Sequence, residues 1–263
     1  MNHLLDLDRF PLNNPQSAPG RQLIESCRRE LADQGMFSLI GLVRPAAIAR
    51  IVADVAPIFE TGAFHHKRRH NIYFDDAIAG LDPDHPALTR FDTSNRTICA
   101  DQIAATALCQ IYEWPPLADF LAAVMGQPRL YPMADPLAKT NVLAYGPSEA
   151  LNWHFDRAEF TTTVMLQATE SGGAFQYRRD LRSADDPNYD GVARLLTDQD
   201  DAVETLNLKP GTLNVFQGKY TAHRVTPVTG GSDRMIAVFS YFERPDVIFS
   251  EAERLGFYGR TGV

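Results

Sequence analysis

The sequence contains few cysteines and no long apolar stretch, and each shortage excludes a class of protein. Its three cysteines, Cys27, Cys99 and Cys109, have spacings that match neither a redox pair nor a zinc site. We therefore expect reduced thiols in a cytoplasmic protein. No run approaches about 18 uninterrupted apolar residues, so we expect no membrane span. The N-terminal stretch also lacks the apolar core of a signal peptide.

Basic residues are also in the minority. The chain has 25 lysines and arginines against 33 aspartates and glutamates, a formal net charge of -8 at pH 7. Surfaces that bind nucleic acid are basic, so this balance argues against a nucleic-acid partner. With 263 residues, of which 44% are hydrophobic, the chain is long enough to form a sizeable core. We expect one domain over residues 1–263 and leave its oligomeric state open.

Helical patterns dominate the first half of the chain, residues 20–127. Apolar residues recur at helical spacing in 21–34, 45–60, 100–111 and 116–125, and glycines follow the first and the last of these segments. A short apolar run at 36–43 predicts a strand between the first two helices. The segment 1–20 is rich in Asn, Pro, Ser and Gly and predicts an extended arm.

After residue 128 the pattern changes to short β runs separated by turns. The predicted strands are 129–133, 138–145, 161–167, 173–177, 206–208, 212–216, 223–226 and 234–241. Many short strands with Gly and Pro turns are typical of a sandwich or barrel. We interpret residues 129–245 as a jelly roll, in a mainly β protein whose N-terminal helices pack against one sheet. The charged, turn-rich segment 178–201 predicts a surface insertion.

A histidine and an aspartate, His154 and Asp156, are separated by one residue. Residues i and i+2 of a β-strand lie on the same face, so this imidazole and this carboxylate can reach one metal ion. His223, in an aromatic and β-branched run, is the candidate third ligand. Two histidines and one carboxylate on one face of an octahedron are the ligand set of non-haem Fe(II) oxygenases, with the other positions left open. We predict that these three residues bind the metal and carry the catalysis.

An arginine, Arg234, follows His223 after ten intervening residues and opens the apolar run 235–239. Hairpin geometry would bring it back beside His223. A buried arginine there can bind a carboxylate through two parallel hydrogen bonds. A dicarboxylate co-substrate requires such a partner when its other end chelates iron. A lone His-x-Asp pair is a weak motif, and its conjunction with His223 and Arg234 makes the pattern specific.

The order H-x-D, then H, then R about one hairpin later resembles the 2-oxoglutarate/Fe(II)-dependent oxygenases, over residues 139–241. Within that superfamily, three segments resemble the hydroxylases and halogenases that act on free amino acids: N-W-H-F-D, G-G-x-F, and G-T-L-N-V-F followed by T-A-H-R-V. The resemblance implies a double-stranded β-helix core of the cupin type. It also implies Fe(II), 2-oxoglutarate and O2 as cofactor and co-substrates, and a small-molecule substrate.

Asp156 distinguishes two outcomes within the resembling group. Its halogenases have Gly or Ala at this position, which leaves a coordination position for chloride. The carboxylate of Asp156 fills that position, so the resemblance implies hydroxylation, with succinate and CO2 as co-products. Arg157 replaces the acidic residue of the lysine-acting members, which argues against a lysine substrate. The alternatives are a halogenase-like enzyme, an oxygenase of peptide- or carrier-bound substrates, and a non-enzymatic cupin-type metal-binding protein.

Other polar residues are candidates for binding the co-substrate or the substrate. Asn141 and Thr163, on predicted strands, can add hydrogen bonds to 2-oxoglutarate. Three histidines and three basic residues cluster within 64–74, and such a charge run predicts a solvated basic loop. The alternative is a loop over the active site, because an N-terminal arginine holds the substrate carboxylate in the resembling enzymes. On that alternative Arg68 and Arg69 bind the substrate, and Arg157 is a further candidate.

Overall fold

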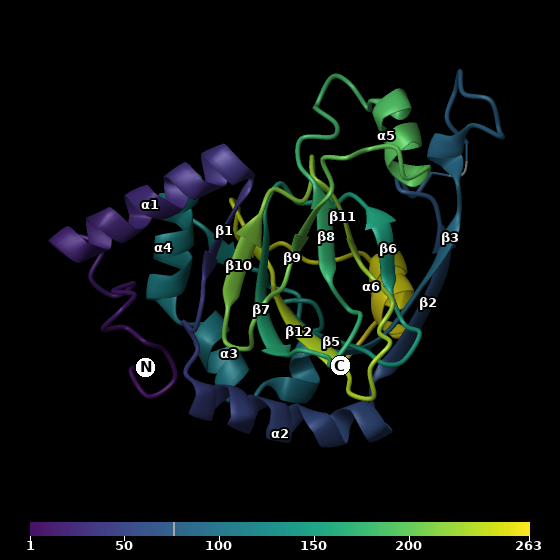
Figure 1. Ribbon diagram of the computed structural model, residues 1–263. Coiled ribbons are helices and arrows are strands. Elements are labelled where there is room, and N and C mark those ends of the chain that lie inside the picture. The colour runs from purple at the N-terminus through teal and green to yellow at the C-terminus, as the bar shows by residue number, and fades with distance from the viewer. Residues whose placement is uncertain (76) are drawn as a thin grey trace.

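The computed structural model describes residues 1–75 and 77–263, and its centre is a pair of antiparallel sheets with helices around them (Figure 1). Tyr145, Met165 and Ile236 of the larger sheet and Val225 of the smaller sheet share one apolar cluster between the two sheets. The protein is therefore mainly β with a sandwich-like core, as the sequence predicts. No helix in the described part of the chain is long and apolar enough to cross a membrane.

The larger sheet has seven strands. Its order is β1 (Met36–Leu39), β10 (Leu213–Phe216), β7 (Thr161–Gln167), β12 (Arg234–Phe239), β5 (Thr140–Tyr145), β3 (Phe91–Ile98) and β2 (Phe64–His70). Successive side chains of each strand point to opposite faces of this sheet, so they alternate between two environments. Val142, Ala144 and Ala237 face the helices, whereas Tyr145 and Ile236 face the smaller sheet.

The smaller sheet has four strands and carries most of the candidate site. Its order is β6 (Leu151–His154), β11 (Ala222–Val225), β8 (Phe175–Arg178) and β9 (Glu204–Leu206). A two-stranded sheet pairs β13 (Tyr241–Phe242) with β4 (Tyr131–Pro132).

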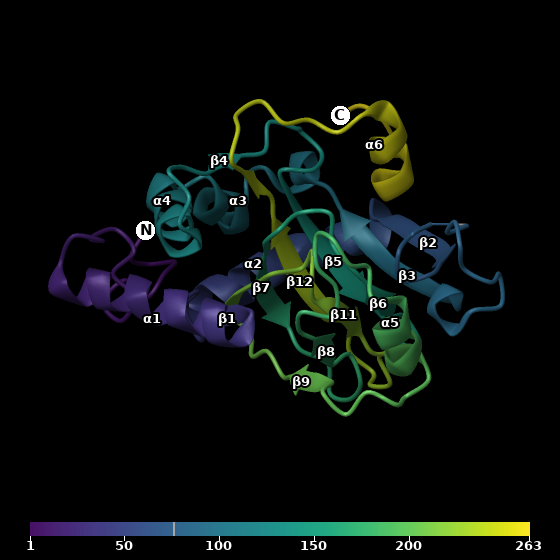
Figure 2. The ribbon, with the colours of Figure 1, turned by 90° about the horizontal axis from the view of Figure 1, so that it is seen from above.

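Four helices from the first half of the chain cover the outer face of the larger sheet (Figures 1 and 2). They are α1 (Ala18–Gln34), α2 (Pro45–Thr61), α3 (Ala107–Tyr112) and α4 (Pro115–Met125). The hydroxyl of Ser17 caps the start of α1, and Gly35 ends it in the left-handed region at φ 71°. The layer exists because each helix has one apolar face to bury, for example Ile51 and Val55 of α2.

Two further helices lie away from this layer. The helix α5 (Tyr189–Leu196) belongs to the segment between β8 and β9, and α6 (Glu251–Tyr258) follows the last strand near the C-terminus (Figure 2). Two short 3-10 helices, η1 (Pro86–Leu88) and η2 (Ala100–Ile103), flank β3. The expected helix at 100–111 is thus divided into η2 and α3, with a break at 104–106.

The basic segment after α2 is a strand and not the solvated loop that the sequence predicts. Phe64–His70 forms β2, the edge strand next to β3. Its charged residues lie on a strand because an edge strand exposes one side to water, where Lys and Arg are favourable. Neither β3 nor α6 is among the predicted elements, whereas most strands of the second half lie within one to three residues of their predicted bounds.

Candidate active site

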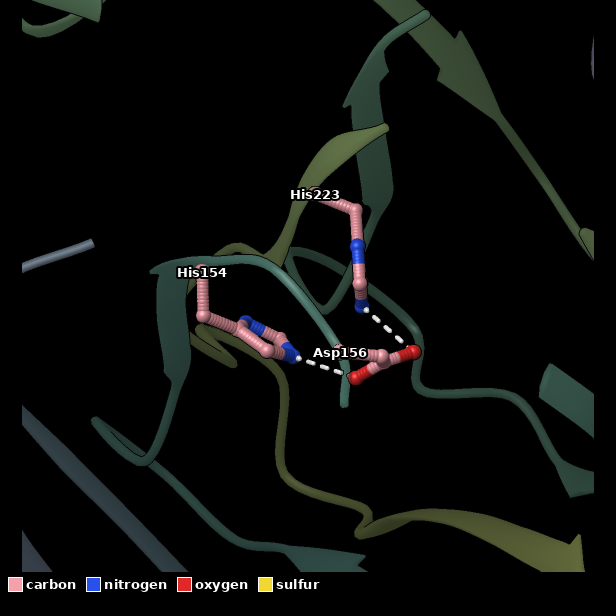
Figure 3. A group of neighbouring side chains, drawn as sticks. All are labelled: His154, Asp156 and His223. Atoms are coloured by element: carbon pink, nitrogen blue, oxygen red, sulfur yellow. Dashed lines mark ion pairs between the residues drawn. The ribbon is translucent and has the colours of Figure 1, made fainter. Parts of the chain in front are cut away.

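Two neighbouring strands of the smaller sheet bring the two histidines together. His154 ends β6, and His223 lies directly opposite it on β11. The two rings have centroids 4.1 Å apart, and both side chains are buried. Asp156 follows β6 by two residues, with its oxygens 3.4 Å from Nε2 of His154 and 3.4 Å from Nε2 of His223 (Figure 3).

Backbone hydrogen bonds fix which nitrogen of each ring faces the aspartate. Nδ1 of His154 lies 2.9 Å from the carbonyl oxygen of Asn152, and Nδ1 of His223 lies 2.9 Å from that of Thr221. A carbonyl only accepts, so each Nδ1 carries a hydrogen and Nε2 is the nitrogen directed at the aspartate. Both Nε2 atoms point toward the same carboxylate, as they would toward a shared metal ion.

The aspartate is held in place by its own contacts. Its backbone N–H donates to the carbonyl oxygen of Gly218 at 3.0 Å, and the Thr161 hydroxyl donates to its Oδ2. Burial works to raise the pKa of Asp156, but His223 and His154 outweigh it and hold that pKa well below the ordinary value. Burial and the neighbouring His223 lower the pKa of His154. Both directions favour an ionised carboxylate and a neutral imidazole, which are the forms that bind a metal ion.

The three groups fit a metal ion. One ligand atom from each of His154, Asp156 and His223 lies within 4.8 Å of the others. Two imidazole nitrogens and one carboxylate oxygen form the donor set of non-haem iron sites, in which the remaining positions stay open.

Arg234 is the most unusual charged residue of the chain. It begins β12 opposite Tyr145, only 1% of its surface is exposed, and its guanidinium lies over the Tyr145 ring at 5.6 Å. Its Nε and Nη1 have no hydrogen-bond partner within residues 1–75 and 77–263. Burial lowers the pKa of Arg234. A buried, unpaired guanidinium is costly, so this arrangement calls for an anionic ligand.

Asn141 and Thr163 lie buried on the inner face of the larger sheet. The Asn141 amide donates to the carbonyl oxygen of Leu137 at 2.8 Å, and its oxygen accepts from the Tyr258 hydroxyl at 3.0 Å. The Thr163 hydroxyl makes a long contact of 3.4 Å to the carbonyl oxygen of Asn214. Asn141 thus has protein partners on both sides, and its role toward a co-substrate stays a prediction, as does that of Thr163.

The three candidate substrate arginines have different surroundings. The Arg68 guanidinium lies 4.7 Å from the centre of the Phe74 ring, and Phe74 in turn contacts the His154 ring edge-to-face at 6.2 Å. Arg69 points to the opposite face of β2 and reaches Asp92 at 3.9 Å. Arg157 is 71% exposed and pairs with Glu253 of α6 at 2.6 Å. The structure therefore brings Arg68, but not Arg69, toward His154 through the ring of Phe74.

The sequence patterns assigned no role in the site to several residues around it. Thr161, Phe74 and Thr93 each contact one of the three candidate residues or a neighbour of one, and His70, which belongs to the basic cluster 64–74, stacks on Phe74. Single polar or aromatic residues carry no motif, and these contacts join segments far apart in sequence. Only Thr161 could have been suspected from sequence, because it begins the predicted strand that follows Asp156.

Comparison with solved structures relates this fold to 2-oxoglutarate/Fe(II) oxygenases. The carbocyclase SnoK from nogalamycin biosynthesis is 15% identical at a TM-score of 0.57, with 90% of this chain and 92% of that one covered. HygX from Streptomyces hygroscopicus, solved with nickel, 2-oxoglutarate and hygromycin B, is 13% identical at 0.55 over 82% and 86%. A prolyl-4-hydroxylase from Pseudomonas putida is 14% identical at 0.53 over 84% and 100%.

The family of the chain follows from its sequence. The model of the family Halogenase D matches residues 20–252, and the chain belongs to this family. A search of curated proteins gives no match. The family and the shared fold confirm the resemblance to 2-oxoglutarate/Fe(II) oxygenases and to their group that includes halogenases.

Proposed function

We propose that the protein is an Fe(II)- and 2-oxoglutarate-dependent oxygenase that hydroxylates an unactivated C–H bond of a small molecule, a free amino acid or a close derivative. The observation that carries the proposal is the combination of a His154–Asp156–His223 donor set with a buried arginine, Arg234, whose Nε and Nη1 have no hydrogen-bond partner in the described part of the chain. A metal-binding protein of the cupin type without oxygenase activity would have no use for that arginine.

Each residue has a separate task in this proposal. His154, Asp156 and His223 hold Fe(II) and leave its other positions to 2-oxoglutarate and O2. Iron and 2-oxoglutarate supply the oxidising chemistry, in which O2 is reduced while 2-oxoglutarate becomes succinate and CO2. Arg234 binds the distal carboxylate of 2-oxoglutarate through its guanidinium, whose Nε and Nη1 have no partner among the described residues.

The architecture supports the same assignment. We interpret the two sheets as the halves of a double-stranded β-helix, the jelly-roll core 129–245, which forms one domain with the helical part 20–127. Apolar side chains between the sheets, including Met165 and Ile236, exclude water from the interior. We assign the segment 178–201 to the rim of the site, since Arg182 lies over the ring of Phe155 at 4.0 Å. Three free, buried cysteines agree with a cytoplasmic location.

Hydroxylation is favoured over halogenation although the family bears the name Halogenase D. Asp156 occupies the position that a halide would need, and its contacts to Thr161 and Gly218 hold the carboxylate there. Product analysis in high chloride tests this point directly. The unmodified enzyme should give only hydroxylated product, and Asp156→Gly should lose most of that activity. A chlorinated product from the unmodified enzyme would contradict the assignment of Asp156 as a ligand.

The basic residue next to the site, Arg68, supports the proposed substrate class. Arg68 provides a positive charge one aromatic ring away from His154, which fits the carboxylate of an amino acid. A screen of amino acids for substrate-stimulated succinate formation with Fe(II), followed by mass spectrometry for the gain of one oxygen atom, tests the function. His223→Ala is the matched inactive control. Succinate formation that no metal affects would refute the proposal.

A further inference from the structure

His154 is fixed by hydrogen bonds that leave its own strand and end on the basic edge strand β2. Its Nδ1–H donates to the carbonyl oxygen of Asn152 at 2.9 Å. The backbone N–H of Asn152 donates to the Thr93 hydroxyl at 3.0 Å. That hydroxyl lies 2.8 Å from Nε2 of His70, whose Nδ1 lies 2.8 Å from the carbonyl oxygen of Asn71. The proposed metal ligand is thereby joined to the larger sheet.

The direction of each hydrogen bond is determined by its partners. The carbonyl oxygen of Asn71 can only accept, so Nδ1 of His70 carries the hydrogen and its Nε2 accepts. The Thr93 hydroxyl has a single hydrogen, which it gives to His70, and a lone pair that receives the N–H of Asn152. Thr93 and His70 are each only 3% exposed, so water does not compete for these bonds.

A second contact supports the ring of the same ligand. His70 stacks on Phe74 at 4.4 Å and 20°, and Phe74 meets the His154 ring edge-to-face at 6.2 Å and 71°. Phe74 has a left-handed backbone, φ 57°, which is rare for a residue with a side chain. His70 therefore contacts the surroundings of His154 by two routes, through Thr93 and through Phe74.

The other histidine is held differently. Nδ1 of His223 also donates to a carbonyl oxygen, that of Thr221, but the Thr221 hydroxyl has no partner in the described part of the chain. Its ring packs on Phe216 at 4.8 Å and on Phe175 at 5.7 Å. Apolar rings hold His223 in place, whereas His154 depends on polar groups from β2 and β3.

We propose that Thr93 and His70 are positioning residues for His154, which keep its Nε2 directed at the metal position beside Asp156. This inference rests on the proposed function, because it requires His154 to be a metal ligand. Partners that orient a metal-binding histidine typically change metal affinity by about 10–100-fold when they are removed.

The test compares metal affinity in variants of two threonines on the same face of β3. Thr93→Val removes the hydroxyl at the centre of the hydrogen-bond chain, and Thr93→Ser keeps it. Thr97→Val is the matched control, because Thr97 is also buried on β3 and its hydroxyl donates at 2.8 Å to Asn95, outside the chain that reaches His154. Anaerobic titration of the full-length protein with Co(II), without 2-oxoglutarate, gives the affinity, and melting of the metal-free protein reports on stability.

We expect Thr93→Val to bind Co(II) about tenfold or more weakly than the unmodified protein. Thr93→Ser should restore the affinity, and Thr97→Val should bind normally even if it melts as early as Thr93→Val. His70→Phe keeps the stacking on Phe74 but loses the nitrogen that accepts from Thr93, so we expect a smaller loss of Co(II) affinity than in Thr93→Val. If Thr93→Val does not fold, the Co(II) affinity of His70→Phe tests the inference instead.

Three results would overturn the inference. They are normal Co(II) affinity in Thr93→Val, normal affinity in His70→Phe if Thr93→Val does not fold, and an equal loss in Thr97→Val. Failure of the unmodified protein to bind Co(II) is a different result. It would refute the proposed function itself, and this inference with it.

Discussion

Gly218 and Asp156 are in direct contact in the candidate site. The backbone N–H of Asp156 donates to the carbonyl oxygen of Gly218 at 3.0 Å, and a Cβ atom on Gly218 would lie 2.2 Å from Oδ2 of Asp156. That oxygen is the one that faces Nε2 of His223 at 3.4 Å. The absence of a side chain at residue 218 is therefore what allows the carboxylate to lie between the two histidines.

Gly218→Ala should weaken metal binding by displacing this carboxylate. We expect the affinity for Co(II), measured by anaerobic titration, to fall about tenfold or more, because the metal loses one of three correctly placed ligands. Gly231→Ala is the control, since a Cβ there meets nothing within 4 Å. Equal affinities in the two variants would mean that the carboxylate has more freedom than the contact implies.

Arg234→Lys should affect the co-substrate far more than the metal. Lysine keeps the charge but loses the planar pair of N–H donors that matches a carboxylate. We expect the apparent affinity for 2-oxoglutarate to fall about tenfold or more while the affinity for Fe(II) is retained. Arg224→Lys is the control, because Arg224 already donates to Gln176 and lies over the Trp153 ring. If only the Arg224 variant loses affinity for 2-oxoglutarate, then Arg224, and not Arg234, binds the co-substrate.

Arg68→Ala and Arg69→Ala should differ although the residues are adjacent. Arg68 lies over Phe74, which contacts His154, whereas Arg69 points to the other face of β2 and reaches Asp92. We expect Arg68→Ala to raise the KM for the amino-acid substrate about tenfold, with turnover of 2-oxoglutarate in the absence of substrate unchanged. Arg69→Ala should leave both quantities near those of the unmodified enzyme. Equal KM values in the two variants would exclude Arg68 from substrate binding.

Asp135 should make stability depend on pH in the acid range. It is fully buried and accepts hydrogen bonds from the backbone of Leu137 and Phe249 and from Arg254 at 2.8 Å. Burial acts to raise the pKa of Asp135, but these hydrogen bonds outweigh it and the pKa is lowered. A carboxyl with a lowered folded-state pKa stabilises the fold above its ordinary pKa, and the stabilisation is lost as pH falls through the folded value.

The corresponding variant is Asp135→Asn. Urea unfolding near neutral pH should show a loss of about 2–3 kcal/mol, since the buried partner of Arg254 is neutralised. The difference from the unmodified protein should shrink as the pH is lowered below about 4. Asp92→Asn is the control, because that side chain is 78% exposed. A difference that stays constant with pH would show that the hydrogen-bond geometry of Asp135, and not its charge, supplies the stability.

Two of the candidate metal-binding residues, His154 and Asp156, were predictable from sequence because their geometry is local. Residues two apart at a strand end point the same way, and His154 and Asp156 need no tertiary information to be paired. His223 was chosen from its aromatic and β-branched run, and Arg234 because a hairpin was expected to bring it back beside His223. That expectation of a hairpin is wrong, because β11 and β12 belong to different sheets and do not pair. The structure brings His154, Asp156 and His223 together as predicted. It adds that Arg234 is buried and that its Nε and Nη1 have no hydrogen-bond partner among residues 1–75 and 77–263.

The surroundings of the site were not predictable in the same way. Arg68 and Arg69 are equivalent candidates in the sequence, and only the pairing of β2 with β3 determines which of them faces His154. Polar sequences such as β2 and β3 lack the apolar alternation that identifies a strand, because their partners lie far away along the chain. Thr93 is a single polar residue in such a strand, so no pattern points to it, and His70 stands out in the sequence only as part of the basic cluster 64–74.

The most direct test of the account is the anaerobic addition of Fe(II) and 2-oxoglutarate to the purified protein. If His154, Asp156 and His223 hold the metal while Arg234 holds the co-substrate, a weak metal-to-ligand charge-transfer band should appear in the visible spectrum only when both are present. The band should be absent in His223→Ala and should require more 2-oxoglutarate in Arg234→Lys. If the unmodified protein shows no band with both components present, the central claim is contradicted.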